Sequence, residues 1–411
     1  MGLTTSEWAL RLKSSPTLAI KALADDLASD GQPIFNFGIG EMNPEIPVPD
    51  SLKAAIAEAL SADATHYSPA AGAGALVEAL ASDLEHFGLN YTDSQIVVCP
   101  GPKDALFKTC LALLCPAQKR NRLLTFTPTY ESFENVPVLV TGKDALLLET
   151  DANLHPEPDK LAKALEGDPS IKVVIINSPN NPSGSVYPRD LIEELARVLG
   201  QHPEVAVISD EVYRTIRYDD SEPYCSIASL LPEQTFVVGG MSKELSGTGL
   251  RVGFVAGPKE GIRVVENVQG NASSCVNLPT QLGYAQFLRE DANLSQRLAI
   301  RDELRSRRDV LIALFRKFAP EATWTSPQGA FYFFPGVQRY LGRKTPSGKV
   351  LETDHDLACY LVEQARVVTV PGSAFLRPGH LRFAYACAPL ASFEEGFARI
   401  GKALEALSVS Q

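Results

Sequence analysis

The sequence predicts an α/β protein with a large doubly wound, mainly parallel sheet domain and a second, smaller α+β domain. The chain of 411 residues exceeds the length of one ordinary hydrophobic core, so two domains are expected. Its middle alternates short, continuous apolar runs with amphipathic helical patterns, which indicates a parallel sheet covered by helices on both faces. After Leu282 the pattern changes to long amphipathic helices and short strands, which is typical of an α+β domain.

The composition excludes several classes of function. Hydrophobic residues make up 45% of the chain, and no apolar run approaches the ~18 residues of a membrane helix, so no membrane span is expected. The formal net charge is −11 and no long basic run occurs, which argues against a nucleic-acid partner. Residues 1–15 contain Glu7, Arg11 and Lys13 and no apolar core of a signal peptide, so we expect a cytoplasmic protein.

The cysteines indicate neither a disulfide framework nor a metal site. Seven are scattered along the chain, an odd number, and none stands in a Cys-x-x-Cys pair. Both disulfide scaffolds and zinc sites need paired, closely spaced cysteines. We therefore expect buried, reduced thiols and no bound metal.

The N-terminal part of the chain is expected to alternate helices with irregular proline-rich and glycine-rich segments. Apolar residues at helical spacing predict a helix over residues 17–27, closed by Asp30-Gly31. A short buried strand is expected over residues 34–40, followed by a helix for which Asp50 is the expected N-cap. Another amphipathic helix is expected over residues 75–87.

The middle of the chain carries the predicted sheet. The apolar runs predict strands at residues 96–98, 123–126, 136–140, 145–148, 173–176, 205–209 and around Phe236. Helical patterns over residues 103–114 and 189–199 lie between them.

The C-terminal part predicts helices over residues 295–317 and 356–364, with short strands at 329–334, 367–370 and 381–385. The expected division is an N-terminal arm with part of the small domain over residues 1–45, a large domain over 46–290 and a small domain over 291–411.

Polar residues follow the predicted strands at the points where these strands end. Asn181 follows the strand at 173–176, Asp210 and Tyr213 follow that at 205–209, and Lys243 follows that at Phe236. Gly101 and a helix N-terminus, which suits an anion, follow residues 96–98. Because ligands of parallel sheets bind beyond the carboxyl ends of the strands, we expect these residues to surround one site.

Lys243 and Arg251 stand eight residues apart in a segment too rich in Gly, Ser and Thr for an ordinary helix or strand. Lysine supplies an amine nucleophile, and arginine supplies a permanently charged fork for phosphate. We expect both side chains to converge on one ligand.

Four separated motifs carry a resemblance to a known family. They are Asn181-Pro182-Ser183-Gly184, Asp210-Glu211-Val212-Tyr213, Ser242-Lys243 with Gly249-Leu250-Arg251-Val252-Gly253, and Arg382 in Leu381-Arg382-Phe383. Together they resemble the pyridoxal-phosphate aminotransferases of fold type I, class I/II, over nearly the whole chain. Gly38-Ile39-Gly40-Glu41, Tyr67-Ser68-Pro69 and the run from Gly329 to Phe331 are most similar to the bacterial aspartate and aromatic branch.

The resemblance implies a role for each residue around pyridoxal 5'-phosphate. Lys243 forms the Schiff base and then carries the substrate proton. Asp210 pairs with the pyridinium nitrogen, and Tyr213 and Asn181 bind the phenolic oxygen. Tyr130 stacks on the ring, where the nearest branch commonly has tryptophan.

The implied phosphate site consists of Arg251, Ser242 and the backbone amides from Gly101 to Lys103. Pro102 departs from the Gly or Ser of many relatives and removes one N–H donor, so we expect the Lys103 N–H and Arg251 to bind more of the phosphate. The Gly239-Gly240 pair is expected to leave room for this phosphate. The residue matching Tyr67 reaches the phosphate of the neighbouring subunit in this family, which implies a homodimer with shared sites.

The implied substrate site has Arg382 on the α-carboxylate, with Gly40 and Asn181 beside it. Position 40 is expected to require a residue as small as glycine, because the substrate would pass close to the backbone there. Tyr130, Asn277 and residues 14–18 are candidates for contact with the substrate side chain, and no second arginine is placed there. The amino acid and the 2-oxo acid therefore stay open.

Three functions are compatible with these residues. The leading one is ping-pong transfer of an amino group from an L-amino acid to a 2-oxo acid. A lyase of the same fold, such as a β-lyase or a cyclopropane-carboxylate synthase, would use the same catalytic residues. A ligand-sensing regulator on this fold would carry an additional DNA-binding domain, whereas only about 15 residues precede the first predicted helix.

Overall fold

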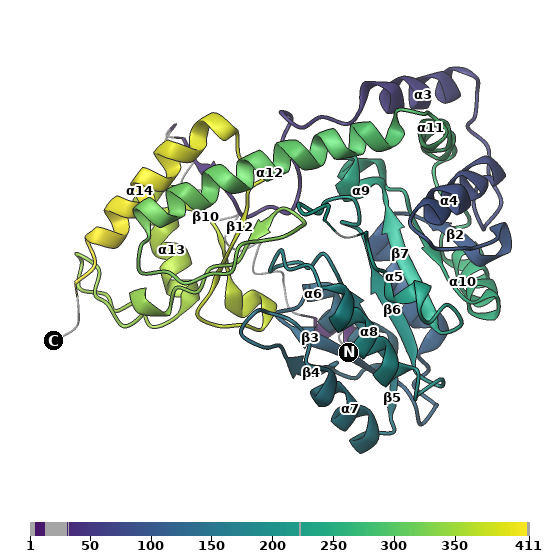
Figure 1. The fold of residues 1–411 in the computed structure, drawn as a ribbon, viewed down its shortest axis with the longest axis horizontal. Coiled ribbons are helices and arrows are strands. Elements are labelled where there is room, and N and C mark those ends of the chain that lie inside the picture. The colour runs from purple at the N-terminus through teal and green to yellow at the C-terminus, as the bar shows by residue number, and fades with distance from the viewer. Residues whose placement is uncertain (1–4, 13–30, 32, 222, 409–411) are drawn as a thin grey trace.

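The computed structural model describes residues 5–12, 31, 33–221 and 223–408 (Figure 1). The helix predicted over residues 17–27 lies outside these ranges, as do the candidate specificity residues 14–18.

A seven-stranded sheet forms the centre of the described part of the chain, in the order β2-β8-β7-β6-β5-β3-β4. Strands β4, β3, β5, β6 and β7 are parallel, whereas β8 runs antiparallel to both β2 and β7. The predicted doubly wound, mainly parallel sheet is therefore confirmed. The strands are β2 (Ile96–Cys99), β3 (Arg122–Thr127), β4 (Leu146–Glu149), β5 (Ile171–Asn177), β6 (Ala206–Asp210), β7 (Thr235–Gly240) and β8 (Gly253–Ala256).

Helices cover both faces of this sheet, because successive side chains of a strand point to opposite faces. On β5, Val173 and Ile175 pack with α5, α6 and α10, whereas Val174 and Ile176 pack with α7 and α8. Further helices, α3, α4 and α11, share a core cluster with β2 and β8. Figure 1 shows α4 next to β2 and α3 next to α11. The bounds are α3 (Asp50–Ser61), α4 (Gly74–His86), α5 (Pro102–Leu113), α6 (Glu131–Thr141), α7 (Pro158–Gly167), α8 (Arg189–Leu199), α10 (Lys259–Ala272) and α11 (Leu278–Leu288).

The strand predicted at residues 136–140 is wrong, because these residues belong to helix α6. Phe133, Val136 and Val140 recur at intervals of three and four residues, and this spacing lets all three pack against the sheet. The strong β preference of valine is overridden here by tertiary packing.

Asp50 is also not an N-cap, since Pro49 occupies that position and Asp50 is the first helical residue.

Five elements of this region were not predicted, namely α7, α9 (Met241–Glu244), α10, α11 and β8. Helix α9 is a single short turn in the segment around Lys243 that was expected to form neither an ordinary helix nor a strand. Strand β8 follows the Gly-rich segment directly and fills the space between β2 and β7. This neighbour gives the Gly239-Gly240 pair a structural reason beside the predicted room for a phosphate. A Cβ at Gly239 would lie 2.5 Å from the ring of Phe254, and one at Gly240 would lie 2.6 Å from the Cα of Gly253. The pair therefore leaves room for β8.

The C-terminal part packs around a second core built mainly from residues after Ile300, with Phe35, Phe37 and Ile46 from near the N-terminus. Strand β1 (Phe35–Asn36) pairs in parallel with β10 (Val367–Val368). Strand β12 (Leu381–Ala384) lies between β11 (Val370–Pro371) and β9 (Tyr332–Phe333) and is antiparallel to both. Residues 367–370, predicted as one strand, are therefore divided between two sheets.

Long helices cover this second core. In Figure 1 helix α12 (Asn293–Phe318) runs from the region of α11 and α9 (Met241–Glu244) to that of α14 (Phe393–Glu405). Helix α13 (Asp354–Ala365) packs against α14, and the short α1 (Glu7–Leu10) contacts α6. Within the described ranges, every helix is too short or too polar to span a bilayer.

Candidate active site

A cavity of about 490 Å³ lies between the carboxyl ends of β5, β6 and β7 and strand β12. Eleven of the thirteen predicted site residues line it, namely Gly40, Pro102, Lys103, Tyr130, Asn181, Asp210, Tyr213, Ser242, Lys243, Arg251 and Arg382. We call the residues that follow the sheet strands, among them Asn181, Asp210, Tyr213 and Lys243, the sheet-edge wall. The residues opposite, Gly40, Tyr332, Phe375 and Arg382, are the facing wall.

The other two predicted residues lie apart from the lining. Gly101 is the N-cap of α5 and immediately precedes Pro102 in the chain. Tyr67 lies on the surface of this chain, with 87% of its area exposed.

Lys243 belongs to the short helix α9, which begins immediately after β7 ends. Its ammonium donates a hydrogen bond to the backbone oxygen of Gly40 on the facing wall. Burial, helped by the positive charge of Arg382, lowers the pKa of the Lys243 ammonium to about 8. A larger fraction of this amine is therefore neutral and nucleophilic near neutral pH than for an exposed lysine.

Asp210 is the last residue of β6 and lies in the same cavity. Burial raises the pKa of its carboxyl to about 7, although the backbone N–H of Val212, 3.4 Å from Oδ1, opposes this shift. Such a carboxyl is stabilised in its ionised form by a positive partner.

The hydroxyl of Tyr213 forms a hydrogen bond of 2.8 Å with the hydroxyl of Tyr332. Burial raises the pKa of Tyr213 well above its usual value, so this side chain remains a neutral donor. Tyr332 had no predicted role, because it stands in the aromatic run from Phe331 to Phe334, which is indistinguishable from core by sequence alone. Its hydroxyl also explains the glycine at position 40, since a Cβ there would lie 2.7 Å from it.

Arg382 is 4% exposed and is held in a fixed orientation. Its Nη1 donates to Asn181 Oδ1 at 3.0 Å and its Nη2 to the Gly38 oxygen at 2.7 Å. The guanidinium carbon lies 4.8 Å from the ring centre of Tyr332 and 4.6 Å from that of Phe375. A guanidinium held between two aromatic rings is ready to bind a carboxylate with little loss of side-chain entropy.

The bond to Arg382 uses the side-chain oxygen of Asn181, and the Asn181 backbone N–H donates to Asn177 Oδ1 at 3.0 Å. The side-chain NH₂ of Asn181 is the group that remains to serve as a donor in the cavity. Asn177 also lines the cavity and bonds the backbone oxygen of Asp210 at 3.0 Å. It therefore ties two strand ends together.

A cradle for an anion lies at the start of α5. Pro102 is the first residue of this helix, and the Arg251 guanidinium donates to the oxygens of Pro100, at 3.1 Å, and Thr248, at 2.7 Å. Gly101 has a φ of +94°, and a Cβ there would lie 2.4 Å from Nη2 of Arg251, so glycine is required beside this arginine. The Ser242 hydroxyl is buried and has no hydrogen-bond partner among the described residues.

Lys103, Tyr130 and Glu131 form the outer edge of the cavity. The Lys103 ammonium lies 5.3 Å from the Tyr130 ring centre and 3.8 Å from Glu131 Oε1. Glu131 was not predicted as a site residue, and neither were Phe375, Leu106 and Thr248, because each stands among ordinary loop or helix residues.

Asn277, a candidate for side-chain contact, instead caps helix α11, where its Oδ1 accepts from the Thr280 N–H at 3.0 Å.

Each functional group of pyridoxal phosphate has a matching partner in this cavity. The amine of Lys243 suits its aldehyde, the carboxyl of Asp210 its ring nitrogen, and the unpaired Ser242 hydroxyl with Arg251 and the α5 N-terminus its phosphate. The fold and the cavity thus define the class of enzymes that hold pyridoxal phosphate on a lysine.

Comparison with known proteins identifies the family within this class. Residues 32–400 match the family model of aminotransferase class I and II. A probable aspartate/prephenate aminotransferase of Aquifex aeolicus is 35% identical over 402 residues, covering 96% of this chain and 97% of that protein. The chain therefore belongs to the class I and II aminotransferases, whose members depend on pyridoxal phosphate, and the predicted family is confirmed.

Solved structures agree with this membership. The aspartate aminotransferase of Rhizobium meliloti superposes with a TM-score of 0.91 at 31% identity, covering 99% of this chain and 100% of that chain. An aromatic aminotransferase of Pyrococcus horikoshii superposes with a TM-score of 0.82 at 29% identity, covering 93% and 98%.

Proposed function

We propose that this aminotransferase moves the amino group of L-aspartate or of an aromatic L-amino acid to a 2-oxo acid by a ping-pong mechanism. The observation that carries the proposal is the cavity itself. Its sheet-edge wall presents a buried amine and a buried carboxyl, and its facing wall presents an arginine fork that is already oriented.

When bound, pyridoxal phosphate supplies an electron-withdrawing ring that stabilises negative charge at the substrate Cα. Lys243 would hold the cofactor covalently and, once the substrate has replaced it, move the proton from Cα. Its lowered pKa, about 8, favours a neutral amine that can accept this proton. Asp210 would hold the ring nitrogen in its protonated form by charge pairing.

Hydrogen bonds and charges would orient the remaining groups. Tyr213 and the side-chain NH₂ of Asn181 would donate to the ring oxygen, and Tyr130 would lie against the ring. Arg251, Ser242 and the Lys103 backbone N–H would bind the phosphate. Arg382 would bind the substrate α-carboxylate in bidentate geometry, and Gly40 would leave space beside it.

The substrate side chain would lie at the outer edge of the cavity. After Lys243, Arg251 and Arg382 have been assigned, Lys103 is the remaining cation among the described residues of the lining, and its ammonium suits the second carboxylate of aspartate. Tyr130 offers an aromatic surface in the same place. The names of the similar proteins, aspartate, aspartate/prephenate and aromatic aminotransferase, support these two donor classes.

We also propose that the enzyme is a cytoplasmic homodimer in which Tyr67 reaches the phosphate site of the partner. Its exposed ring is compatible with this arrangement, because the side chain is free to contact a second subunit. The scattered free cysteines of the described residues suit a reducing compartment. Light scattering of the loaded protein tests the assembly, and a stable monomer with full activity would overturn it.

The function is tested with a panel of twenty amino acids and 2-oxoglutarate, in which glutamate, the new 2-oxo acid and ammonia are measured. Transfer predicts equal amounts of glutamate and 2-oxo acid without ammonia, with aspartate or an aromatic amino acid fastest. A lyase, which the same catalytic residues allow, would release ammonia in step with product. Ammonia release without glutamate would therefore replace the proposal.

A further inference from the structure

The three residues that follow the proposed catalytic residues turn away from the cavity into one buried cluster of charges. Glu211 follows Asp210, Arg214 follows Tyr213, and Glu244 follows Lys243. Their exposed fractions are 1%, 3% and 6% respectively. Charged side chains are rarely buried so completely unless they are paired, so the partners of these three indicate what the cluster does.

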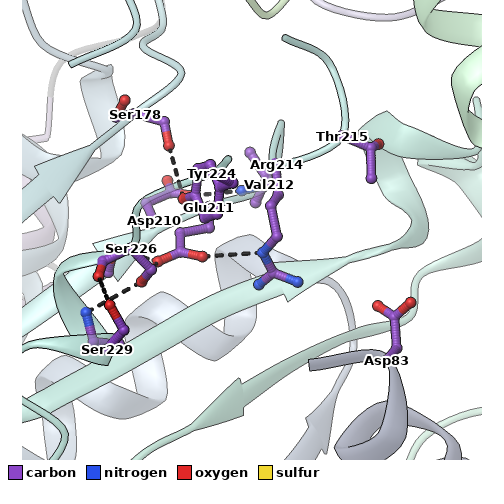
Figure 2. A network of polar contacts seen from close by, with 12 residues as sticks. Asp83, Ser178, Asp210, Glu211, Val212, Arg214, Thr215, Tyr224, Ser226 and Ser229 are labelled. Atoms are coloured by element: carbon purple, nitrogen blue, oxygen red, sulfur yellow. Dashed lines mark hydrogen bonds and ion pairs between the residues drawn. The ribbon is translucent and has the colours of Figure 1, made fainter. Parts of the chain in front are cut away.

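Glu211 and Arg214 form a buried ion pair next to Asp210 in the chain. The Arg214 Nε donates to Glu211 Oε2 at 3.0 Å, and Figure 2 shows the two side chains lying end to end. Glu211 Oε1 accepts from the hydroxyls of Ser209, at 2.7 Å, and Ser226. Since Ser209 precedes Asp210 on β6, the Glu211 carboxylate is fastened to the strand end that carries Asp210.

Glu244 joins the Lys243 segment to the Tyr213 segment. Its Oε1 accepts the backbone N–H of Thr215 at 2.7 Å, which is a direct bond between residues adjoining Lys243 and Arg214. Its Oε2 lies 3.7 Å from Nη1 of Arg297, on the first turns of α12. One carboxylate thus connects two segments of the sheet-edge wall to the long helix.

Arg297 anchors the outer end of the cluster. Its Nη1 lies 3.3 Å from Asp83 Oδ2 on α4, and its Nη2 donates to Asp83 Oδ1 and to Asn293 Oδ1. The guanidinium carbons of Arg214 and Arg297 lie 5.1 and 5.9 Å from the ring centre of Phe87, which covers both cations. The ring face is attracted to both cations, and this contact adds to the ion pairs.

We propose that Glu211, Arg214, Glu244 and Arg297, the back cluster, are positioning residues that fix Asp210, Tyr213 and Lys243 relative to one another, with Glu244 as the central connection. The proposal rests on the proposed roles of those three residues. None of the back-cluster residues lines the cavity described above, so they act through their neighbours in the chain.

The charged character of the cluster supports a geometric role. Buried ion pairs add little net stability compared with apolar side chains of similar size, because removing the charges from water costs about as much as the pairs return. Their hydrogen bonds are directional, however, and fix the angle at which each segment leaves its strand. A displacement of about 1 Å at a reacting group is enough to cost a large part of the rate.

The test uses Glu244→Gln and Arg297→Met in the pyridoxal-phosphate-loaded protein. Glutamine keeps an acceptor for the Thr215 N–H but removes the charge opposite Arg297. We expect about tenfold weaker cofactor binding and about tenfold lower kcat for each variant, with KM for the amino donor within about twofold because Arg382 is untouched. The pH midpoint of the absorption band of the lysine-bound cofactor should also shift. Because both residues act through the same contact, the double variant should bind the cofactor and turn over no more poorly than the more impaired of the two single variants.

Arg307→Met is the matched control. Arg307 lies on the same helix, is equally buried, and pairs with Glu303, at 2.8 Å, and Glu45, at 2.7 Å, away from the cavity. It should lower the melting temperature without changing cofactor affinity or the pH midpoint. If the Glu244 and Arg297 variants behave like this control, the positioning role is overturned.

One further variant and one measurement on the wild-type chain keep the test decisive. If Arg297→Met does not fold, Asp83→Asn at the outer end of the cluster should show a smaller change in the same direction, and an unchanged cofactor affinity there would contradict the proposal. A wild-type chain that binds the cofactor but transfers no amino group would refute the proposed function alone. The cofactor-affinity and pH measurements would still decide the role of the cluster.

Discussion

The two walls of the cavity are built from different chemistry. The sheet-edge wall contains groups whose protonation is adjustable, because burial raises the pKa of Asp210 to about 7 and lowers that of Lys243 to about 8. The facing wall contains Arg382, a permanent cation between the rings of Tyr332 and Phe375. From this difference we expect the sheet-edge wall to accept and donate protons and the facing wall to bind and orient the substrate.

The largest effect is expected from Lys243→Ala on the sheet-edge wall. The variant loses both the covalent attachment of the cofactor and the proton carrier, so activity should fall by at least about a thousandfold, or about 4 kcal/mol. Single-turnover rates and the absorption band of the lysine-bound cofactor measure it. Lys108→Met, which removes a buried lysine that does not line the cavity, should retain the band. Turnover by Lys243→Ala at the wild-type rate would refute the assignment of this wall.

Arg382→Lys tests the facing wall and should have the next largest effect. Lysine keeps the charge but loses the planar fork, so KM for every amino donor should rise about a hundredfold, close to 3 kcal/mol, whereas kcat should change much less. The rise should be the same for aspartate and aromatic donors because they share the α-carboxylate. Arg399→Lys, in a surface pair with Glu395, is the control and should leave KM unchanged. A loss confined to kcat would contradict the division between the walls.

The smallest effect is expected from Tyr332→Phe, which removes one of the hydrogen bonds between the walls and leaves those of Arg382 with Asn181 and of Lys243 with Gly40. Loss of one hydroxyl partner of Tyr213 costs about 1 kcal/mol, so kcat should fall about fivefold. Tyr385→Phe breaks a similar buried pair, with Tyr218 at 2.8 Å, outside the cavity lining. This control should lower the melting temperature without lowering kcat. Equal kcat values for both variants would mean that the Tyr213–Tyr332 hydrogen bond does not contribute to the rate.

The sequence alone determined the arrangement of the sheet-edge wall. Asn181, Asp210 and Lys243 follow uninterrupted apolar runs, and the carboxyl ends of parallel strands must meet at one edge of the sheet. The prediction that these residues surround one cavity therefore needed only local patterns and one topological rule. The fold class was predicted from the same patterns, whereas the family was predicted from the resemblance carried by four separated motifs.

Gly40 and Arg382 of the facing wall were predicted, but only the tertiary structure placed Tyr332 and Phe375 beside them and assembled the back cluster. Tyr332 and Phe375 look like core residues in the sequence, and the contacts of Arg382 with Asn181 and Gly38 span 201 and 344 residues. Glu211, Arg214 and Glu244 look like surface charges until their burial is known. The helix over residues 136–140 and the antiparallel β8 were missed for the same reason. Local patterns report the period of a segment, but the neighbours against which that segment packs are set by contacts between distant parts of the chain.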